Sequence, residues 1–141
     1  MINLNLKIGI IGLGYVGLPL FLCSSKFFPT KGFDINRKRI SELKNNYDFS
    51  EEYSKSVLKK LNFSNKISSK FNFLSDCNFY IITVPTPVKR KNIPDISFLE
   101  SACTLLSKFI KKNDIVVFES TVYPGLTRHL CINIIQKKSS L

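Results

Sequence analysis

Short apolar runs alternate along this chain with longer segments in which apolar and polar residues are mixed. Five runs have the length typical of strands rather than helices, and four of them are mainly apolar. In the first run the isoleucines follow Lys7 with no further polar side chain between them, as expected for a strand buried on both faces. The expected strands are Lys7–Ile11, Thr30–Asp34, Phe71–Leu74, Phe79–Val84 and Ile115–Phe118.

Helical periodicity and capping residues mark the segments between these runs. Asn36 is expected to cap one helix, and Ser97 with Glu100 matches a capping box at the start of another. Glu51 and Glu52 are expected to open a further helix at its positive end. The expected helices are Val16–Lys26, the segment from Asn36 to Asn45, Ser50–Leu61, the segment from Ser97 to Ile110, and Leu126–Gln136. The expected loops are Asn62–Ser69 and Pro85–Pro94.

Strands that alternate with helices of about ten residues predict right-handed crossovers and a mostly parallel sheet covered on both faces. The fold class is therefore α/β, a doubly wound domain. With 141 residues, the chain is expected to form one domain over residues 1–141. Ligands of such sheets bind at the carboxyl ends of the strands, so the loops after the strands are the candidate site.

Net charge and composition narrow the function classes. The formal net charge is +11, with 21 basic and 10 acidic residues, which raises nucleic acid or an anionic membrane as a partner. Most of the basic residues are lysines in a chain that is also rich in isoleucine and asparagine, a bias typical of AT-rich codons. Nucleic acid binding is therefore not expected to be the main role.

The cysteines predict neither a metal site nor a disulfide framework. Cys23, Cys77, Cys103 and Cys131 are widely separated, and His129 is the single histidine, so no metal site is expected. Three of the four, all except Cys77, fall in apolar periodic segments and are expected to be small buried hydrophobes. This pattern fits a reducing compartment.

One uncharged run, from Ile8 to Ser25, imitates a signal peptide or a membrane span. Its four glycines and Pro19 would weaken a membrane helix, and no small-residue cleavage site follows it. We therefore predict no membrane insertion and a cytoplasmic location.

A glycine-rich loop follows the first expected strand. Gly12, Gly14 and Gly17 form G-x-G-x-x-G between a strand and a helix, the context in which this motif binds a dinucleotide. Gly12 permits the tight turn, Gly14 lets a pyrophosphate approach the backbone, and Gly17 allows close packing of helix on strand. Free N–H groups at the start of the helix then meet the anion.

Asp34 ends the second expected strand, where a carboxylate accepts hydrogen bonds from the adenosine ribose. A carboxylate there repels a ribose 2′-phosphate, which favours NAD over NADP. Arg37, Lys38 and Arg39 lie close behind it and leave NADP open as an alternative. The loops after the fourth and fifth strands, Thr83–Val88 and Glu119–Gly125, carry hydroxyls framed by prolines. From the residues alone, cofactor contacts and ordinary turn chemistry fit these loops equally well.

Five runs of the sequence carry a resemblance to a known family: Lys7–Leu20, Gly32–Asn36, Val84–Pro87, Pro94–Asp95 and Glu119–Gly125. Together they resemble the N-terminal domain of the UDP-glucose/GDP-mannose dehydrogenase family, from about Lys7 to Leu141. The last run most resembles the branch that acts on UDP-N-acetylhexosamines and supplies uronic acids for bacterial surface polysaccharides.

This resemblance implies a Rossmann-type domain of an enzyme that oxidises a sugar 6-hydroxyl to a carboxylate with two NAD, through a thiohemiacetal and a thioester on a cysteine. Arg39 is implied to lie by the adenine, and Thr121 also to help order active-site water. The cofactor-binding residues implied by the motifs and their loops are Gly12, Gly14, Tyr15, Val16, Gly17, Asp34, Arg39, Val84, Thr86, Ser120 and Thr121.

The family's nucleophilic cysteine, its assisting lysine and asparagine, and its sugar-nucleotide domain all follow the point at which this chain stops. We therefore expect the NAD-binding part of a truncated UDP-sugar dehydrogenase, with no catalytic residue of its own. Its UDP-sugar is expected to bind only with the missing domains, and the full-length family is oligomeric. Two alternatives stay open: a stand-alone NAD-binding module without turnover, and a basic protein that uses Lys89–Lys91 on an anionic polymer.

Overall fold

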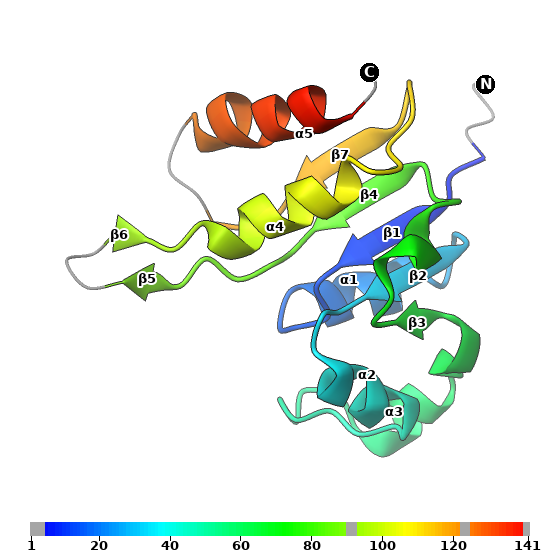
Figure 1. Ribbon diagram of the computed structural model, residues 1–141. Coiled ribbons are helices and arrows are strands. Elements are labelled where there is room, and N and C mark those ends of the chain that lie inside the picture. The colour runs from blue at the N-terminus through cyan, green and yellow to red at the C-terminus, as the bar shows by residue number, and fades with distance from the viewer. Residues whose placement is uncertain (1–4, 90–92, 122–124, 140–141) are drawn as a thin grey trace.

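Five strands pair in parallel to form the central sheet, in the order β3-β2-β1-β4-β7 (Figure 1). The computed structural model describes residues 5–89, 93–121 and 125–139. The strands are β1 (Ile8–Ile11), β2 (Thr30–Phe33), β3 (Ile67–Ser68), β4 (Phe79–Ile82) and β7 (Ile115–Phe118). The chain runs from β1 outward to β3 and then returns to β4 on the other side of β1. The strand order therefore reverses beside β1, and the expected doubly wound α/β fold is confirmed.

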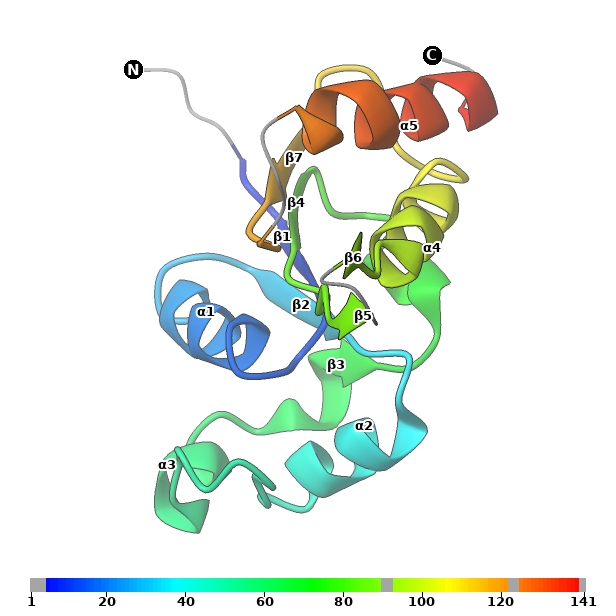
Figure 2. The same ribbon diagram turned by 90° about the vertical axis from the view of Figure 1, so that its left-hand side faces the viewer.

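Helices cover both faces of this sheet (Figure 2). On one side lies α1 (Gly17–Ser24), and on the other lie α4 (Ser97–Leu106) and α5 (Ile132–Lys138). The β2–β3 connection holds α2 (Arg37–Lys44) and α3 (Lys55–Lys59). Helices thus cover both faces at the centre of the sheet, while the edge strand β7 is only partly buried.

Alternation along β1 builds a hydrophobic core on each face. Ile10 packs in the same cluster as Leu18 and Phe21 of α1, whereas its neighbour Ile11 packs with Leu99 of α4. All five side chains are at most 1% exposed. Because successive side chains of a strand point to opposite faces, one run of isoleucines serves both cores.

The segment after β3 departs from the expected strand. Residues Phe71–Leu74 form a 3-10 turn, η2, in which Phe71 packs edge-on against Phe33 with ring centroids 4.7 Å apart. The third strand is instead Ile67–Ser68, inside the stretch expected to be a loop, and it pairs Ile67 with Gly32. A two-residue strand carries no readable alternation, so the sequence pattern favoured the wrong segment.

The predicted Asn36 cap is confirmed, because the backbone amides of Lys38 and Arg39 donate to its side-chain oxygen. Two other helix starts differ from expectation. The predicted helix from Ser50 is reduced to α3 (Lys55–Lys59), because Ser50 turns back onto Asp48 instead. The Ser97 capping box is wrong as well. The backbone amide of Ser97 donates to Asp95 Oδ1 at 3.1 Å, so a carboxylate outside the helix caps that end.

The last helix begins as a π-helical turn, η4 (Thr127–Cys131), before α5. The extra residue in this turn shifts the helical phase by one position. The buried residues are therefore Leu126, Cys131 and Ile135 rather than the expected stripe of Leu126, Leu130 and Ile134. A continuous 3.6-residue period does not reveal such an insertion.

The expected loop between Pro85 and Pro94 contains a small antiparallel pair, β5 (Val88–Lys89) with β6 (Ile93–Pro94). Arg90 and Lys91 of the basic run lie outside the described residues, as do Val122, Tyr123 and Pro124 of the last motif. Across the described ranges, no helix is long and apolar enough to cross a membrane.

Candidate functional site

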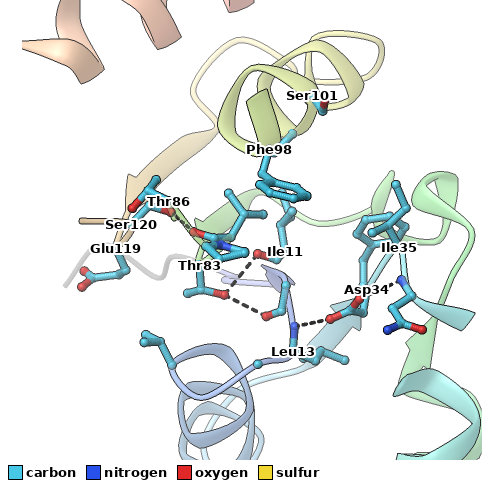
Figure 3. A pocket seen from close by; sticks show the side chains of 18 of the residues that line it. Ile11, Leu13, Asp34, Ile35, Thr83, Thr86, Phe98, Ser101, Glu119 and Ser120 are labelled. Atoms are coloured by element: carbon cyan, nitrogen blue, oxygen red, sulfur yellow. Dashed lines mark hydrogen bonds between the residues drawn. The ribbon is translucent and has the colours of Figure 1, made fainter. Parts of the chain in front are cut away.

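A pocket of about 840 Å³ opens at the carboxyl ends of the parallel strands. The loops after β1, β2, β4 and β7 line it, and the first two turns of α4 form its upper wall, with the Phe98 ring above Thr83 (Figure 3). This position, beside the reversal in strand order, is where doubly wound sheets bind ligands. The topology therefore places the candidate loops in one cavity.

The glycine loop makes a tight turn whose shape depends on two of its glycines. Gly12 has φ +99°, in the left-handed region that favours glycine, and its amide donates to the Phe33 carbonyl at 2.8 Å. A Cβ on Gly17 would lie 1.8 Å from the Gly12 carbonyl oxygen and 2.5 Å from Thr83 Oγ1. These two positions therefore accept only glycine.

Gly14 differs from both, because a Cβ built on it meets no atom within 4 Å. Its backbone borders the pocket, so the space beside it is open and wide enough for a group outside the protein core. Gly12 and Gly17 thus have the turn and helix-packing geometry that the motif predicts, while the ligand-approach role of Gly14 stays a prediction.

The start of α1 offers unpaired donors to the pocket. Among the described residues, the backbone amides of Gly14, Tyr15 and Val16 donate to no protein acceptor. Leu18 N, further on, already donates to Gly14 O at 3.0 Å. Free amides at a helix N-terminus, next to a surface without a side chain, form an anion site suited to a phosphate.

Asp34 joins the end of β2 to the glycine loop. Its Oδ2 accepts from the Leu13 amide and its Oδ1 from the Asn36 amide, both at 2.8 Å (Figure 3). A carboxylate has about four acceptor positions, so two lone pairs stay free on the pocket side. The carboxylate is thus oriented by the backbone and retains the capacity to accept from two hydroxyls.

Arg39 does not present a free charge to the pocket. Its side chain is 4% exposed, Nε donates to the Leu13 carbonyl at 2.8 Å, and Nη1 bonds to Asp48 Oδ1 at 2.8 Å. Burial alone would raise the pKa of Asp48, but hydrogen bonds from Ser50 and Arg39 hold it below its ordinary value. The resemblance implies Arg39 beside the adenine, whereas the structure ties it to the glycine loop.

Hydroxyl groups bridge the loops after β4 and β7. Ser120 Oγ donates to the Val84 carbonyl, and Thr86 Oγ1 donates to the Thr121 carbonyl, each at 2.6 Å. Thr83 Oγ1 donates to Gly12 O at 2.8 Å and so connects the β4 loop to the glycine turn. These bonds hold three loops, from distant parts of the sequence, around one cavity.

The structure brings ten of the eleven expected site residues to the pocket wall; Gly17 lies beneath the loop, packed on Gly12 and Thr83. Sequence reasoning placed Thr83 in a loop at the ligand edge but missed Ile35, Phe98 and the Asp48–Ser50 turn. Ile35 directly follows Asp34 at the end of a strand, which was a usable signal. For Phe98 and Asp48 the sequence offered none.

The cysteines take no part in this pocket. Cys77, Cys103 and Cys131 are buried, and burial raises the pKa of each thiol, for Cys77 to about 11. Cys23 is exposed on α1, so the expectation that it is buried is wrong: α1 is apolar on more faces than the sheet can cover. In the described segments, no cluster of three or more His, Cys, Asp or Glu side chains could hold a metal ion.

Comparison with known proteins gives a consistent result. The sequence model of the UDP-glucose/GDP-mannose dehydrogenase family, NAD binding domain, matches residues 6–141. UDP-N-acetyl-D-glucosamine 6-dehydrogenase of Salmonella typhi is 44% identical over 137 residues, and that of Pseudomonas aeruginosa 42% over 139 residues. In both cases the match covers 97% of this chain and 32% of the relative.

Among solved structures, a ternary complex of GDP-mannose dehydrogenase from Pseudomonas aeruginosa superposes with a TM-score of 0.85 at 25% identity. The match covers 96% of this chain and 33% of that one. The chain therefore spans about a third of the length of the relatives that it resembles.

Proposed function

This chain belongs to the UDP-glucose/GDP-mannose dehydrogenase family as its NAD binding domain, and on that premise we propose how its pocket holds NAD. The pyrophosphate lies on the free amides of Gly14, Tyr15 and Val16, and the adenosine ribose donates to Asp34. The observation that carries this assignment is the presence of both features, an anion site and an oriented carboxylate, on one wall of one pocket.

The remaining assignments follow from the direction of the cofactor. With the ribose at Asp34 and the pyrophosphate at the β1 turn, the second half of NAD extends toward the loops after β4 and β7. Val84, Thr86, Ser120 and Thr121 line that side. The Thr86 and Ser120 hydroxyls donate their protons to backbone carbonyls, so toward a ligand their oxygens can act only as acceptors.

Replacing Asp34 with Ala is expected to weaken NAD binding about tenfold to a hundredfold, the usual range for losing a hydrogen bond to a charged group. In the parent chain, NADP is expected to bind more weakly than NAD, because the carboxylate opposes a 2′-phosphate. Titration calorimetry with both cofactors measures both effects. Asp76→Ala is the matched control, since Asp76 pairs with Lys31 outside the pocket. Equal affinities for NAD and NADP in the parent chain would refute the role of Asp34.

For the whole reaction we propose that this domain serves a UDP-N-acetylhexosamine 6-dehydrogenase, which forms the uronic acid used in polysaccharide biosynthesis. The support is its 44% and 42% identity to two UDP-N-acetyl-D-glucosamine 6-dehydrogenases. The stand-alone NAD-binding module stays the second candidate. The observation that favours it is that no cysteine lines the pocket within the described part of the chain.

The isolated 141-residue chain is expected to bind NAD without reducing it when UDP-sugars are added. Hydride transfer needs an oriented sugar hydroxyl, and positioning alone accounts for roughly 7 to 11 kcal/mol of such a barrier. The second oxidation needs a thiolate at the pocket, whereas the three buried thiols have raised pKa values. NADH absorbance with a panel of UDP-sugars is the assay. Sustained turnover that one Cys→Ser change abolishes would contradict this expectation.

A further inference from the structure

Arg39 and Asp48 form a buried ion pair beside the cofactor pocket. No motif in the sequence predicted this pair. The side chains of Arg39 and Asp48 are 4% and 0% exposed, and their closest atoms, Nη1 and Oδ1, lie 2.8 Å apart. Arg39 lies in α2, while Asp48 lies in the turn that follows it. A buried pair of this kind needs additional hydrogen bonds to offset the loss of water, and here both partners have them.

Asp48 is held on one side by a short turn. Its Oδ2 accepts from Ser50 Oγ at 2.7 Å, and its main-chain carbonyl accepts from the Glu51 amide at 3.0 Å. Phe49 lies between Asp48 and Ser50 in the sequence. Its ring centroid lies 4.5 Å from the Arg39 guanidinium carbon and 5.9 Å from the Tyr15 ring centroid. The turn from Asp48 to Ser50 therefore packs against both the arginine and the glycine loop.

On the other side, Arg39 Nε donates to the carbonyl of Leu13 at 2.8 Å. This carbonyl belongs to the same planar peptide as the Gly14 amide, and in a trans peptide the two groups point in opposite directions. The bond that holds the Leu13 carbonyl on Arg39 thus turns the Gly14 N–H away from it. Asp34 fixes the preceding peptide through the Leu13 amide.

Arg39 borders the pocket, although its side chain is only 4% exposed. Its Nη2 is shielded from solvent and has no hydrogen-bond partner among the described residues. Its other two donor nitrogens are directed at Leu13 and Asp48. The bond to Leu13 gives Arg39 a route to a bound cofactor through the Leu13–Gly14 peptide.

We propose that Arg39 and Asp48 are positioning residues for the pyrophosphate subsite: Asp48 and Ser50 fix the guanidinium, and the guanidinium fixes the peptide whose amide meets the phosphate. This inference rests on the proposed NAD site and adds to it the turn Asp48–Ser50, whose Phe49 also lines the pocket. It assigns Arg39 a role distinct from a contact with the adenine.

The test compares ligands with and without the pyrophosphate. Arg39→Lys keeps the positive charge but lacks the planar fork that reaches both partners, and Asp48→Asn removes the charge that orients it. Both variants are expected to bind NAD and ADP about tenfold to a hundredfold more weakly than the parent chain. Adenosine, measured by competition with NAD, is expected to lose less than about threefold, because Asp34 remains in place.

Glu42→Gln is the matched control, since it also removes one carboxylate from the α2 region, but one that pairs with the exposed Lys38 rather than with Arg39. It is expected to leave all three affinities unchanged. Equal losses for adenosine and ADP in Arg39→Lys would show a direct adenine contact and overturn the proposal. Unchanged ADP affinity in a folded Asp48→Asn variant would also overturn it.

A milder variant covers the case in which the ion-pair variants do not fold. Ser50→Ala removes only the hydroxyl that holds Asp48 Oδ2 and leaves no buried charge without its partner. It is expected to weaken ADP by about threefold and leave adenosine unchanged; an unchanged ratio of the two affinities would refute the proposal. Failure of the parent chain to bind NAD and ADP would instead refute the proposed function, so the two failures are distinguishable.

Discussion

Replacing Gly17 with Ala is expected to destabilise the domain and abolish NAD binding together. The added Cβ would lie 1.8 Å from a backbone carbonyl oxygen, that of Gly12, and 2.5 Å from the Thr83 hydroxyl. Backbone at this turn cannot yield easily, because the Gly12 amide is bonded to Phe33 and Thr83 is bonded to Ile11 and Gly12. The helix α1 would have to move off β1.

We expect the free energy of unfolding to fall by about 3 kcal/mol, since overpacking and the loss of the Thr83 hydrogen bonds act together. The corresponding drop in Tm is roughly 10 °C. Thermal unfolding followed by circular dichroism measures it. The control is the same substitution three residues earlier, Gly14→Ala, where a Cβ meets open space and Tm is expected to stay within a few degrees of the parent. An unchanged Tm in Gly17→Ala would show that the turn is less tightly packed than this geometry requires.

Gly14→Val is expected to have the opposite profile: a stable domain that no longer binds NAD. The Gly14 backbone is not in the left-handed region, and no protein atom lies within 4 Å of a Cβ built there. The branched side chain would instead occupy the space over the free amides of Tyr15 and Val16, where the pyrophosphate is proposed to lie. The effect is therefore on binding and not on folding.

Titration calorimetry is expected to show a loss of at least a hundredfold in NAD affinity, or about 2.7 kcal/mol. The free energy of unfolding is expected to stay within about 1 kcal/mol of the parent value. Adenosine, which lacks the phosphates, is expected to retain most of its affinity in this variant. Parental NAD affinity in Gly14→Val would move the phosphates elsewhere and remove the main support for the proposed site.

The parts of the site that the sequence could predict are those that a single short segment defines. Gly12, Gly14 and Gly17 lie in one turn, and their roles depend on backbone torsion and on the absence of a Cβ, which are local properties. Asp34 could be predicted for a similar reason, because it ends a strand whose neighbour carries the glycine turn. The Asp34 bond to the Leu13 amide follows from that parallel pairing.

The contacts of Arg39 could not be predicted from a short segment of the sequence. The family resemblance implied a place beside the adenine, and the structure places Arg39 at the pocket wall but also pairs it with Asp48. The partner lies in a segment where the sequence predicted the start of a helix at Ser50. Because Ser50 bonds to Asp48, the helix begins later and the turn packs on the glycine loop. An ion pair formed by folding leaves no periodic signal in the chain.

The sequence by itself determined the α/β class, four of the five strands of the sheet, the glycine turn and the carboxylate at the end of β2. Apolar runs, capping residues and glycine motifs act over a few residues, so they can be recognised from the sequence alone. Only the tertiary structure decided the two-residue strand β3, the π-helical turn before α5, the hydroxyl bridges between the β4 and β7 loops, and the Arg39–Asp48 pair. Each of these depends on contacts between separate segments of the chain. Those contacts stabilise the structure only once the sheet has formed.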